Sequence, residues 1–162
     1  MTRIALISDV HSNEVALRAV LADIRRTGVD QIICLGDVAN LGPQPNAVVE
    51  ILAELGCPSI MGNHDEFLLE PEFVHSYAQS PRVAASVEWS RSKLSSVELD
   101  FVRSFERDRE IDLGGASTLY VFHGSPRSNV EDIVATTSTD ILDEMLAGAT
   151  ATVMAGGHTH IQ

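Results

Sequence analysis

Gly157-His158-Thr159-His160 follows the apolar run Val153-Met154-Ala155 and one further glycine in this sequence. The pattern predicts a buried strand that ends in a turn. Two imidazoles at this spacing can bind neighbouring metal ions, although a His-x-His motif alone is weak evidence for a metal site. Whether these two histidines have partners depends on the sequence upstream of them.

Four upstream stretches share one arrangement, in which a short apolar run is followed by polar or metal-ligating side chains. They are Asp9-Val10-His11, Gly36-Asp37, Gly62-Asn63-His64-Asp65 and Phe122-His123-Gly124. Five of the six histidines therefore fall where a predicted strand passes into a loop. In open α/β sheets this edge is where active sites form, so the sequence predicts a shared site there.

The size and charge of the chain limit the classes of function. Its 162 residues, 44% of them apolar, suffice for one folded domain with its own core. A net charge of -12 and a sequence pI near 4.7 disfavour binding of nucleic acid or an anionic membrane through the protein surface, because such binding depends on Lys and Arg. A small phosphorylated substrate is still compatible with this charge, since bound cations can reverse the local sign.

The apolar and cysteine patterns bear on location. No apolar run approaches the roughly 18 residues that a membrane span requires, and the N-terminal run is too short for a signal peptide. The two cysteines, Cys34 and Cys57, are expected to be buried thiols in a reducing compartment rather than a disulfide. The cytoplasm is therefore the expected location.

Hydrophobic periodicity predicts an α/β fold. Apolar residues from Leu17 to Ile24 recur at helical spacing before Gly28, which indicates a helix from about residue 13. A second helix is expected to end at Gly56. The predicted strands that alternate with these helices cover residues 3–8, 31–35 and 58–61. This alternation is typical of a parallel sheet.

The pattern changes after Asp65. Residues 66–109 predict two helices, one at about 83–94 and one that starts at the capping box Ser95-Ser96-Val97-Glu98. We interpret this segment as a helical insertion that covers the ligand-bearing edge of the sheet, within a single domain of residues 1–162. The remaining predicted elements are a hairpin of residues 110–113 and 117–122, a helix at 140–147 and a strand at 152–155.

Five motifs occur in this sequence in a fixed order, namely Asp-x-His, Gly-Asp, Gly-Asn-His-Asp, His-Gly and Gly-His-x-His. In this the chain resembles the calcineurin-like metallophosphoesterases, specifically their small bacterial and archaeal phosphodiesterase branch. The resemblance runs from Asp9 to His160, which is nearly the whole chain. It implies an α/β/β/α sandwich, with a parallel-rich sheet and helices on the outside.

Hydrolysis of a phosphate ester requires neutralised phosphoryl charge and a nucleophile near neutral pH. Two metal ions roughly 3.5–4 Å apart that share a water or hydroxide supply both. Asp37 is the natural bridging carboxylate, because Gly36 lets its side chain stand clear of the strand. The resemblance implies that Asp9, His11 and His160 bind the first metal and that Asn63, His123 and His158 bind the second. Mixed carboxylate, amide and imidazole ligands suit Mn, Fe or Zn better than Mg or Ca, and Mn is the metal we favour.

The resemblance also assigns roles outside the metal ligands. It implies that His64 protonates the leaving oxygen or stabilises the transition state. Asp65 is expected to orient the His64 imidazole and to hold it charged. Asn40 and Arg127 are predicted to contact the substrate phosphate, Arg127 through a bidentate contact. A solvated loop position is the alternative for Arg127.

Each motif alone has an ordinary structural explanation. Asp9 could cap the helix that follows it, Gly36-Asp37 could form a common turn, and His123 could be a loop histidine without a ligand. The five motifs together, in the order of the family, make coincidence an inadequate explanation.

The expected function is hydrolysis of phosphate esters, above all of small phosphodiesters. Two alternatives are a serine/threonine protein phosphatase and a dinucleoside tetraphosphate hydrolase, which typically carry Gly-Asp-x-x-Asp-Arg-Gly and Gly-Asn-His-Glu. Here Asn40 and Leu41 replace the Asp-Arg pair and Asp65 replaces the Glu, so a phosphate-clamping arginine is missing. A third alternative is a non-catalytic interaction scaffold, as in a retromer subunit of similar fold. This chain keeps His64 and every implied ligand, which favours an enzyme.

Proteins that this chain resembles continue after the position of Gln162 with further strands that complete the second sheet. We therefore expect either that the sequence belongs to a longer polypeptide or that another chain covers the unpaired sheet edge. Such an edge is a template for self-association.

Overall fold

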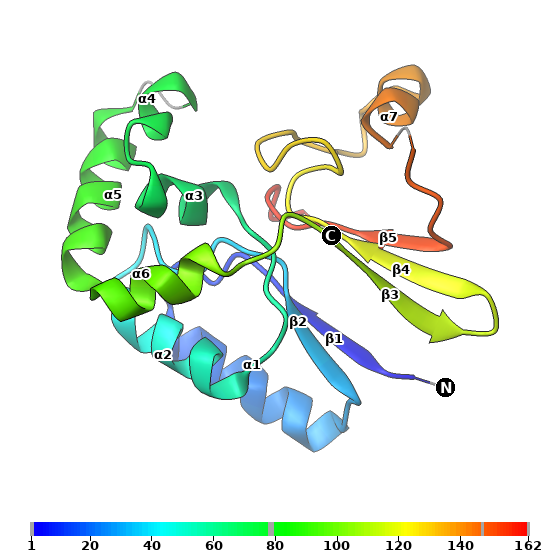
Figure 1. The fold of residues 1–162 in the computed structure, drawn as a ribbon, viewed down its shortest axis with the longest axis horizontal. Helices are drawn as coiled ribbons and strands as arrows, with labels where there is room; N and C mark the ends of the chain where they lie inside the picture. The colour runs from blue at the N-terminus through cyan, green and yellow to red at the C-terminus, as the bar shows by residue number, and fades with distance from the viewer. Residues whose placement is uncertain (1, 78–79, 147, 162) are drawn as a thin grey trace.

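The computed structural model describes residues 2–77, 80–146 and 148–161. Gln162 lies outside the described residues, and so does Ala147, the last residue of the helix predicted at 140–147. Within the described part, the chain is a mixed α/β fold with two sheets and helices outside them, which confirms the predicted fold class (Figure 1).

The first sheet is built from a strand, a helix and a strand. β1 (Ile4–Ile7) and β2 (Gln31–Cys34) pair in parallel, and α1 (Glu14–Thr27) connects them. The Asn13 side chain caps α1 by accepting a hydrogen bond from Ala16 N–H at 3.0 Å, which satisfies a donor that has no partner within the helix. The helix ends at Gly28, as the sequence predicts.

The segment 58–61, predicted as a third strand, forms only isolated β-bridges, so the prediction of a full strand was wrong. The bridges join Ser59 to Cys34 and Ile60 to Glu106, both in parallel. Ile60 N–H donates to Cys34 O at 2.8 Å, which keeps the segment beside β2. Pairing does not continue because the chain turns at Gly62 into a helix.

Most of the sequence between β2 and the first strand of the second sheet is helical. They are α2 (Pro45–Leu55), α3 (Asn63–Leu69), α4 (Phe73–Tyr77), α5 (Pro81–Lys93) and α6 (Ser96–Arg103). The capping box predicted for α6 is confirmed, since Ser95 N–H donates to the Glu98 carboxylate at 2.6 Å and Glu98 N–H donates to Ser95 Oγ at 3.3 Å. α3 and α4 were not predicted, because 7 and 5 residues are too short to show a helical periodicity. That this segment is an insertion into the domain stays a prediction.

The second sheet has the strand order β3-β4-β5. β3 (Arg109–Gly114) and β4 (Ser117–Val121) form the predicted hairpin. β5 (Val153–Ala155) pairs in parallel with β4 and follows α7 (Thr139–Leu146).

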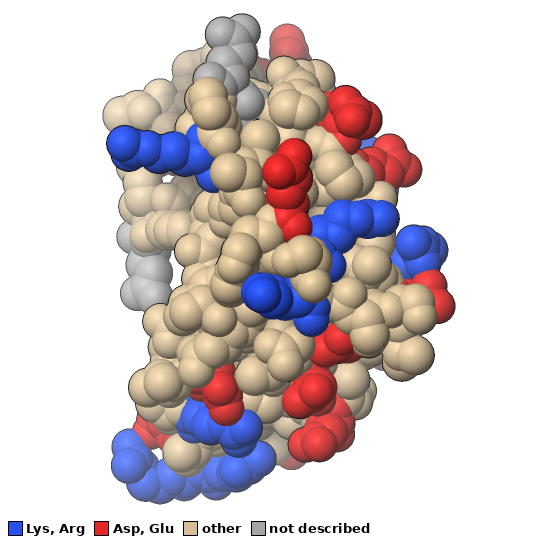
Figure 2. Space-filling model, turned by 90° about the vertical axis from the view of Figure 1, so that its left-hand side faces the viewer, with Lys and Arg blue, Asp and Glu red and all other residues tan. Residues whose placement is uncertain are grey.

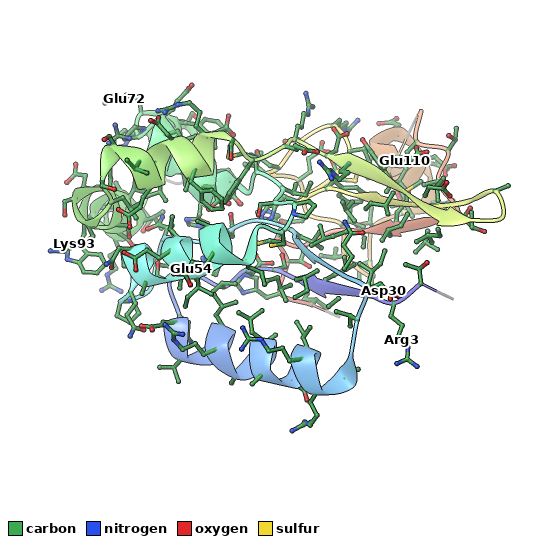
Figure 3. All side chains as sticks on the ribbon, turned by 60° about the horizontal axis from the view of Figure 1, so that its bottom comes forward. Arg3, Asp30, Glu54, Glu72, Lys93 and Glu110 are labelled. Atoms are coloured by element: carbon green, nitrogen blue, oxygen red, sulfur yellow. The ribbon has the colours of Figure 1, made fainter. Side chains whose placement is uncertain are left out.

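Two apolar clusters join the layers. One packs α1, α2 and α6 against the first sheet and includes Leu21, Leu52 and Val102. The other lies between the sheets, where Ile33 of β2 packs in one cluster with Val121 of β4. Figure 3 shows the resulting order, with α1 on one side of β1 and β2 and with β3 on the other.

The outer surface carries charges of both signs. On the face formed by the helices at the left of Figure 1, basic and acidic side chains are interspersed (Figure 2). The described residues of this face therefore form no continuous basic surface of the kind that nucleic acid requires. In the described ranges, no helix has both the length and the apolar character needed to cross a membrane.

Candidate metal centre

Hydrogen bonds join the loops that follow the strands. Asp9 N–H donates to Gly36 O at 3.0 Å, which ties the loop after β1 to the loop after β2. Gly157 N–H donates to His123 O at 2.8 Å, which ties the loop after β5 to the loop after β4. The two sheets are linked in turn by His123 Nδ1, which lies 2.6 Å from Leu35 O. The predicted strand-end motifs therefore lie in one region.

Five of the seven predicted metal ligands have a left-handed backbone conformation. Their φ angles are 54° for Asp9, 45° for His11, 56° for Asp37, 72° for His158 and 55° for His160. This conformation costs roughly 1 kcal/mol or more for a residue other than glycine, and it concentrates at functional sites. The hydrogen bonds between the loops hold the backbone in this state.

Glycine is required where two of these loops touch. Gly36 has a φ of 99°, and a Cβ at this position would lie 2.5 Å from Gly62 N. A Cβ on Gly62 would lie 2.1 Å from Asp37 Oδ1. A side chain at either glycine would therefore displace the Asp37 carboxylate or its loop.

The ligand atoms of Asp9, His11 and His160 form a first group, in which all lie within 4.8 Å of one another. His160 Nε2 lies 3.2 Å from both His11 Nε2 and Asp9 Oδ1. Metal–nitrogen bonds of about 2.1 Å place neighbouring ligand atoms roughly 3 Å apart. The spacing in this group therefore fits ligands that surround one cation.

A second group consists of Asp37, His123 and His158, whose ligand atoms also lie within 4.8 Å of one another. Asn63 adjoins it, because Asn63 Oδ1 lies 3.2 Å from His123 Nε2. Asp37 Oδ2 lies 3.4 Å from His123 Nε2 and 3.8 Å from His11 Nε2, so it stands between the two groups. The structure thus brings together all seven residues that the sequence suggested as ligands.

Orphaned polar atoms show that these residues fit a cation. Among the described residues, the buried atoms Asp9 Oδ1 and His158 Nε2 make no hydrogen bond, although His160 Nε2 and Asp132 Oδ1 lie 3.2 and 3.3 Å from them as ion-pair contacts. A buried polar atom without a partner costs about 1–3 kcal/mol, which coordination to a metal would offset. Burial also lowers the pKa of His11 and of His158, which favours the neutral imidazole that binds metals.

The His123–Asp37 pair dominates the electrostatics of the second group. Burial lowers the pKa of His123, but the hydrogen bond and the negative charge of Asp37 outweigh it and raise the pKa above its usual range. Burial raises the pKa of Asp37, and His123 more than reverses this. Because His123 Nδ1–H donates to Leu35 O, Nε2 is the ring nitrogen available to a metal.

His64 is oriented by Asn40 and not by Asp65, so the role predicted for Asp65 was wrong. Asn40 Nδ2 donates to His64 Nδ1 at 2.9 Å. Burial lowers the pKa of His64 to about 4, so the ring is neutral rather than held charged. His64 and Asp65 are successive residues of α3, and successive residues on a helix do not face each other. Asn40 is completely buried, so its predicted contact with the substrate phosphate is also contradicted.

Asp65 instead fixes the backbone around Asp37. Its Oδ2 accepts hydrogen bonds from Asp37 N–H at 2.7 Å and Gly62 N–H at 3.1 Å, and its Oδ1 accepts one from Val38 N–H at 2.8 Å. Burial and the neighbouring Asp37 charge raise the pKa of Asp65, while these backbone donors oppose the shift. The position of Asp37 therefore depends on Asp65.

Arg127 lies in a solvated loop, which was the alternative to its predicted contact with phosphate. Its Nε donates to both carboxylate oxygens of Glu131, at 2.8 and 2.9 Å, and its side chain is 48% exposed. It lines a cavity of about 370 Å³ next to the ligand groups, together with Arg107. The predicted phosphate contact of Arg127 is not supported by this geometry.

The ligand groups open into a second cavity of about 430 Å³. Tyr77 and Asp132 line it, and neither was singled out from the sequence. Asp132 Oδ1 lies 3.3 Å from His158 Nε2. Tyr77 ends the short helix α4 and Asp132 lies in a loop outside every motif, so no local pattern could have identified them.

The sequence of residues 2–162 matches the calcineurin-like phosphoesterase superfamily domain. The chain belongs to this superfamily. Calcineurin-like phosphoesterases are typically dependent on divalent metals, and the two ligand groups in this chain agree with that property. The resemblance drawn from the five motifs is confirmed.

Three similar proteins show how much of the chain the likeness covers. A metallophosphoesterase from Sphaerobacter thermophilus has 31% identity and a TM-score of 0.74, over 99% of this chain and 61% of that chain. A hypothetical protein from Pyrococcus horikoshii shares the fold with a TM-score of 0.76 at 18% identity, over 90% of this chain and 64% of that one. An uncharacterized protein of Methanocaldococcus jannaschii is 36% identical over 124 residues, which is 76% of this chain and 50% of that protein. The chain thus spans about half to two thirds of the length of these relatives.

Proposed function

We propose that this chain carries a two-metal phosphoesterase centre that hydrolyses phosphate esters, most readily small phosphodiesters. One observation carries the proposal: Asp37 Oδ2 lies within 4 Å of a histidine nitrogen from each ligand group, at 3.4 and 3.8 Å. A single carboxylate oxygen between two sets of ligands is the arrangement that a bridging ligand requires.

Two divalent ions would neutralise charge on the phosphoryl oxygens and make a water nucleophilic near neutral pH. Carboxylate, amide and imidazole ligands together suit Mn, Fe or Zn, of which we favour Mn. In this assignment Asp9, His11 and His160 hold one ion, and Asn63, His123 and His158 hold the other. Asp37 is shared by both.

We assign to His64 the role of assisting the departure of the leaving group. It lines the same cavity as His11 and Asp37, and its Nδ1 is occupied by Asn40. The proton of the neutral ring is therefore on Nε2, which can donate a hydrogen bond to the departing oxygen and stabilise the negative charge that develops on it. This role does not require His64 to bind a metal.

The position of Leu41 bears on the alternative enzymes. Serine/threonine phosphatases and dinucleoside tetraphosphate hydrolases carry an arginine where this chain has Leu41. Leu41 is 48% exposed and lines the candidate cavity, so an apolar side chain stands where those enzymes have a phosphate clamp. This observation favours a small diester over their substrates. The cytoplasmic location stays a prediction.

A paired measurement tests the proposal. The purified protein is assayed for bound metal and for turnover of a chromogenic phosphodiester, a chromogenic monoester and a phosphopeptide. We expect about two metals per chain, and diester turnover that is lost on chelation and restored by Mn²⁺. Full activity after exhaustive chelation would overturn the metal mechanism. Metal binding without turnover of any ester would favour the non-catalytic scaffold.

A further inference from the structure

Helix α5 contacts the candidate centre through two serines. Ser86 Oγ donates to Asn40 Oδ1 at 2.9 Å, and Ser90 Oγ donates to the same oxygen at 3.1 Å. Ser90 is completely buried and Ser86 is half-buried. Neither serine belongs to a motif of the superfamily, and neither touches a ligand residue in the described hydrogen bonds.

The direction of the Asn40 amide follows from a third contact. Leu41 N–H reaches Asn40 Oδ1 at 2.8 Å, and a backbone N–H can only donate. The amide oxygen is therefore on the side of Leu41 and the serines, and Nδ2 is on the side of His64. Since Nδ2 can only donate, His64 Nδ1 must accept its hydrogen bond.

We propose that Ser86 and Ser90 are positioning residues, which hold the Asn40 amide so that His64 Nδ1 accepts its hydrogen bond and the ring carries its proton on Nε2. Without the two hydroxyls, Asn40 Oδ1 keeps only the Leu41 N–H as a donor, so the amide is held less firmly and a rotated orientation becomes populated. A rotated amide presents its oxygen to His64 Nδ1, which favours the opposite tautomer and removes the proton from Nε2. The kinetic consequence rests on the proposed function, whereas the tautomer does not.

The first arm of the test is kinetic. The double variant Ser86→Ala/Ser90→Ala is compared with Ser92→Ala, whose exposed hydroxyl bonds only to Trp89 O of the same helix. We expect kcat for an alkyl phosphodiester to fall about tenfold in the double variant, with KM and metal content unchanged. The loss should be smaller for an ester with an acidic leaving group, whose departing oxygen needs less stabilisation. Ser92→Ala should match the parent, and Ser86→Thr, which keeps a hydroxyl, should keep its kcat.

The second arm reads the tautomer directly in the metal-free protein. Two-bond ¹⁵N–¹H spectra of the histidine side chains, assigned with His64→Ala, show which ring nitrogen carries the proton. We expect Nε2–H in the parent and in Ser92→Ala, and a measurable Nδ1–H population in the double variant. An unchanged His64 tautomer in a folded double variant overturns the proposal, whatever happens to kcat. If the parent turns over no ester, the proposed function fails while this spectrum still decides the inference.

Discussion

Asp37 is held at both oxygens of its carboxylate. Oδ2 faces His11 and His123, and Oδ1 accepts a hydrogen bond from His64 N–H at 2.9 Å. The residue is only 1% exposed. Because a buried carboxylate needs compensating positive charge, Asp37 is the side chain on which both proposed metals depend most.

We expect Asp37→Ala to abolish binding of both metals, because its removal leaves two cations facing each other with less compensating charge. His123→Ala should deplete mainly one, leaving about one metal per chain. Metal content by mass spectrometry checks both. Asp30→Ala is the matched control, since Asp30 lies on the chain just before β2, at the end away from the ligand loops (Figure 3). Retention of both metals by Asp37→Ala would contradict the shared carboxylate.

We expect His64→Ala to separate binding from chemistry. Metal content should stay near that of the parent, while kcat for an alkyl diester falls about 10²–10⁴-fold, the range expected for loss of a group that assists the departing oxygen. The defect should shrink as the leaving group becomes more acidic. An unchanged kcat for the alkyl ester would remove His64 from the mechanism.

At the scale of elements, the start of α3 determines the shape of the loop after β2. The Asp65 carboxylate accepts three backbone hydrogen bonds, from Asp37, Val38 and Gly62. It is completely buried. The loop that carries Asp37 is therefore attached to a helix rather than to the sheet alone.

We expect Asp65→Ala to destabilise the fold by about 3 kcal/mol, because it leaves buried N–H groups without partners. Asp65→Asn should cost less, since the amide keeps one acceptor oxygen. Denaturant unfolding measures both, with Glu72→Ala as an exposed acidic control that should stay within about 0.5 kcal/mol of the parent (Figure 3). Equal unfolding midpoints for Asp65→Ala and Glu72→Ala would show that this clamp contributes nothing.

At the scale of the whole molecule, both sheets present strand edges. Within the described residues β5 pairs only with β4, and its Val153 is 49% exposed. A cavity of about 410 Å³ separates this region from β1 and is lined by Leu6, Ala155 and Ile161. An exposed apolar edge of this kind favours pairing with another chain.

We therefore expect this chain to self-associate as its concentration rises, with a mass above 17.5 kDa in light scattering. Val153→Lys should shift the equilibrium toward the monomer, because a charged side chain on an edge strand opposes pairing. Val97→Lys is the matched control, since Val97 is 76% exposed on α6, away from any strand. A monomer at every concentration would contradict the prediction.

The sequence by itself indicated an α/β fold, the strand ends and the residue types of the candidate ligands, because these patterns are local. Short apolar runs followed by Asp or His appear directly in the chain, and so do helix signals such as Asn13 and Gly28. The grouping of the ligands came from the resemblance to a family, and the strand-end loops place them in those groups.

Only the tertiary structure decided which side chains meet across the site. His64 and Asp65 are neighbours in sequence, yet one faces the cavity and the other the backbone, because successive residues on a helix point in different directions. Asn40 contacts a helix more than 40 residues later in the chain, at Ser86 and Ser90, and no local pattern encodes such a pair. Arg127 was predicted to contact phosphate, but its guanidinium pairs with Glu131, which lies four residues further along the same loop. Contact partners depend on packing and side-chain direction, which a single sequence does not reveal.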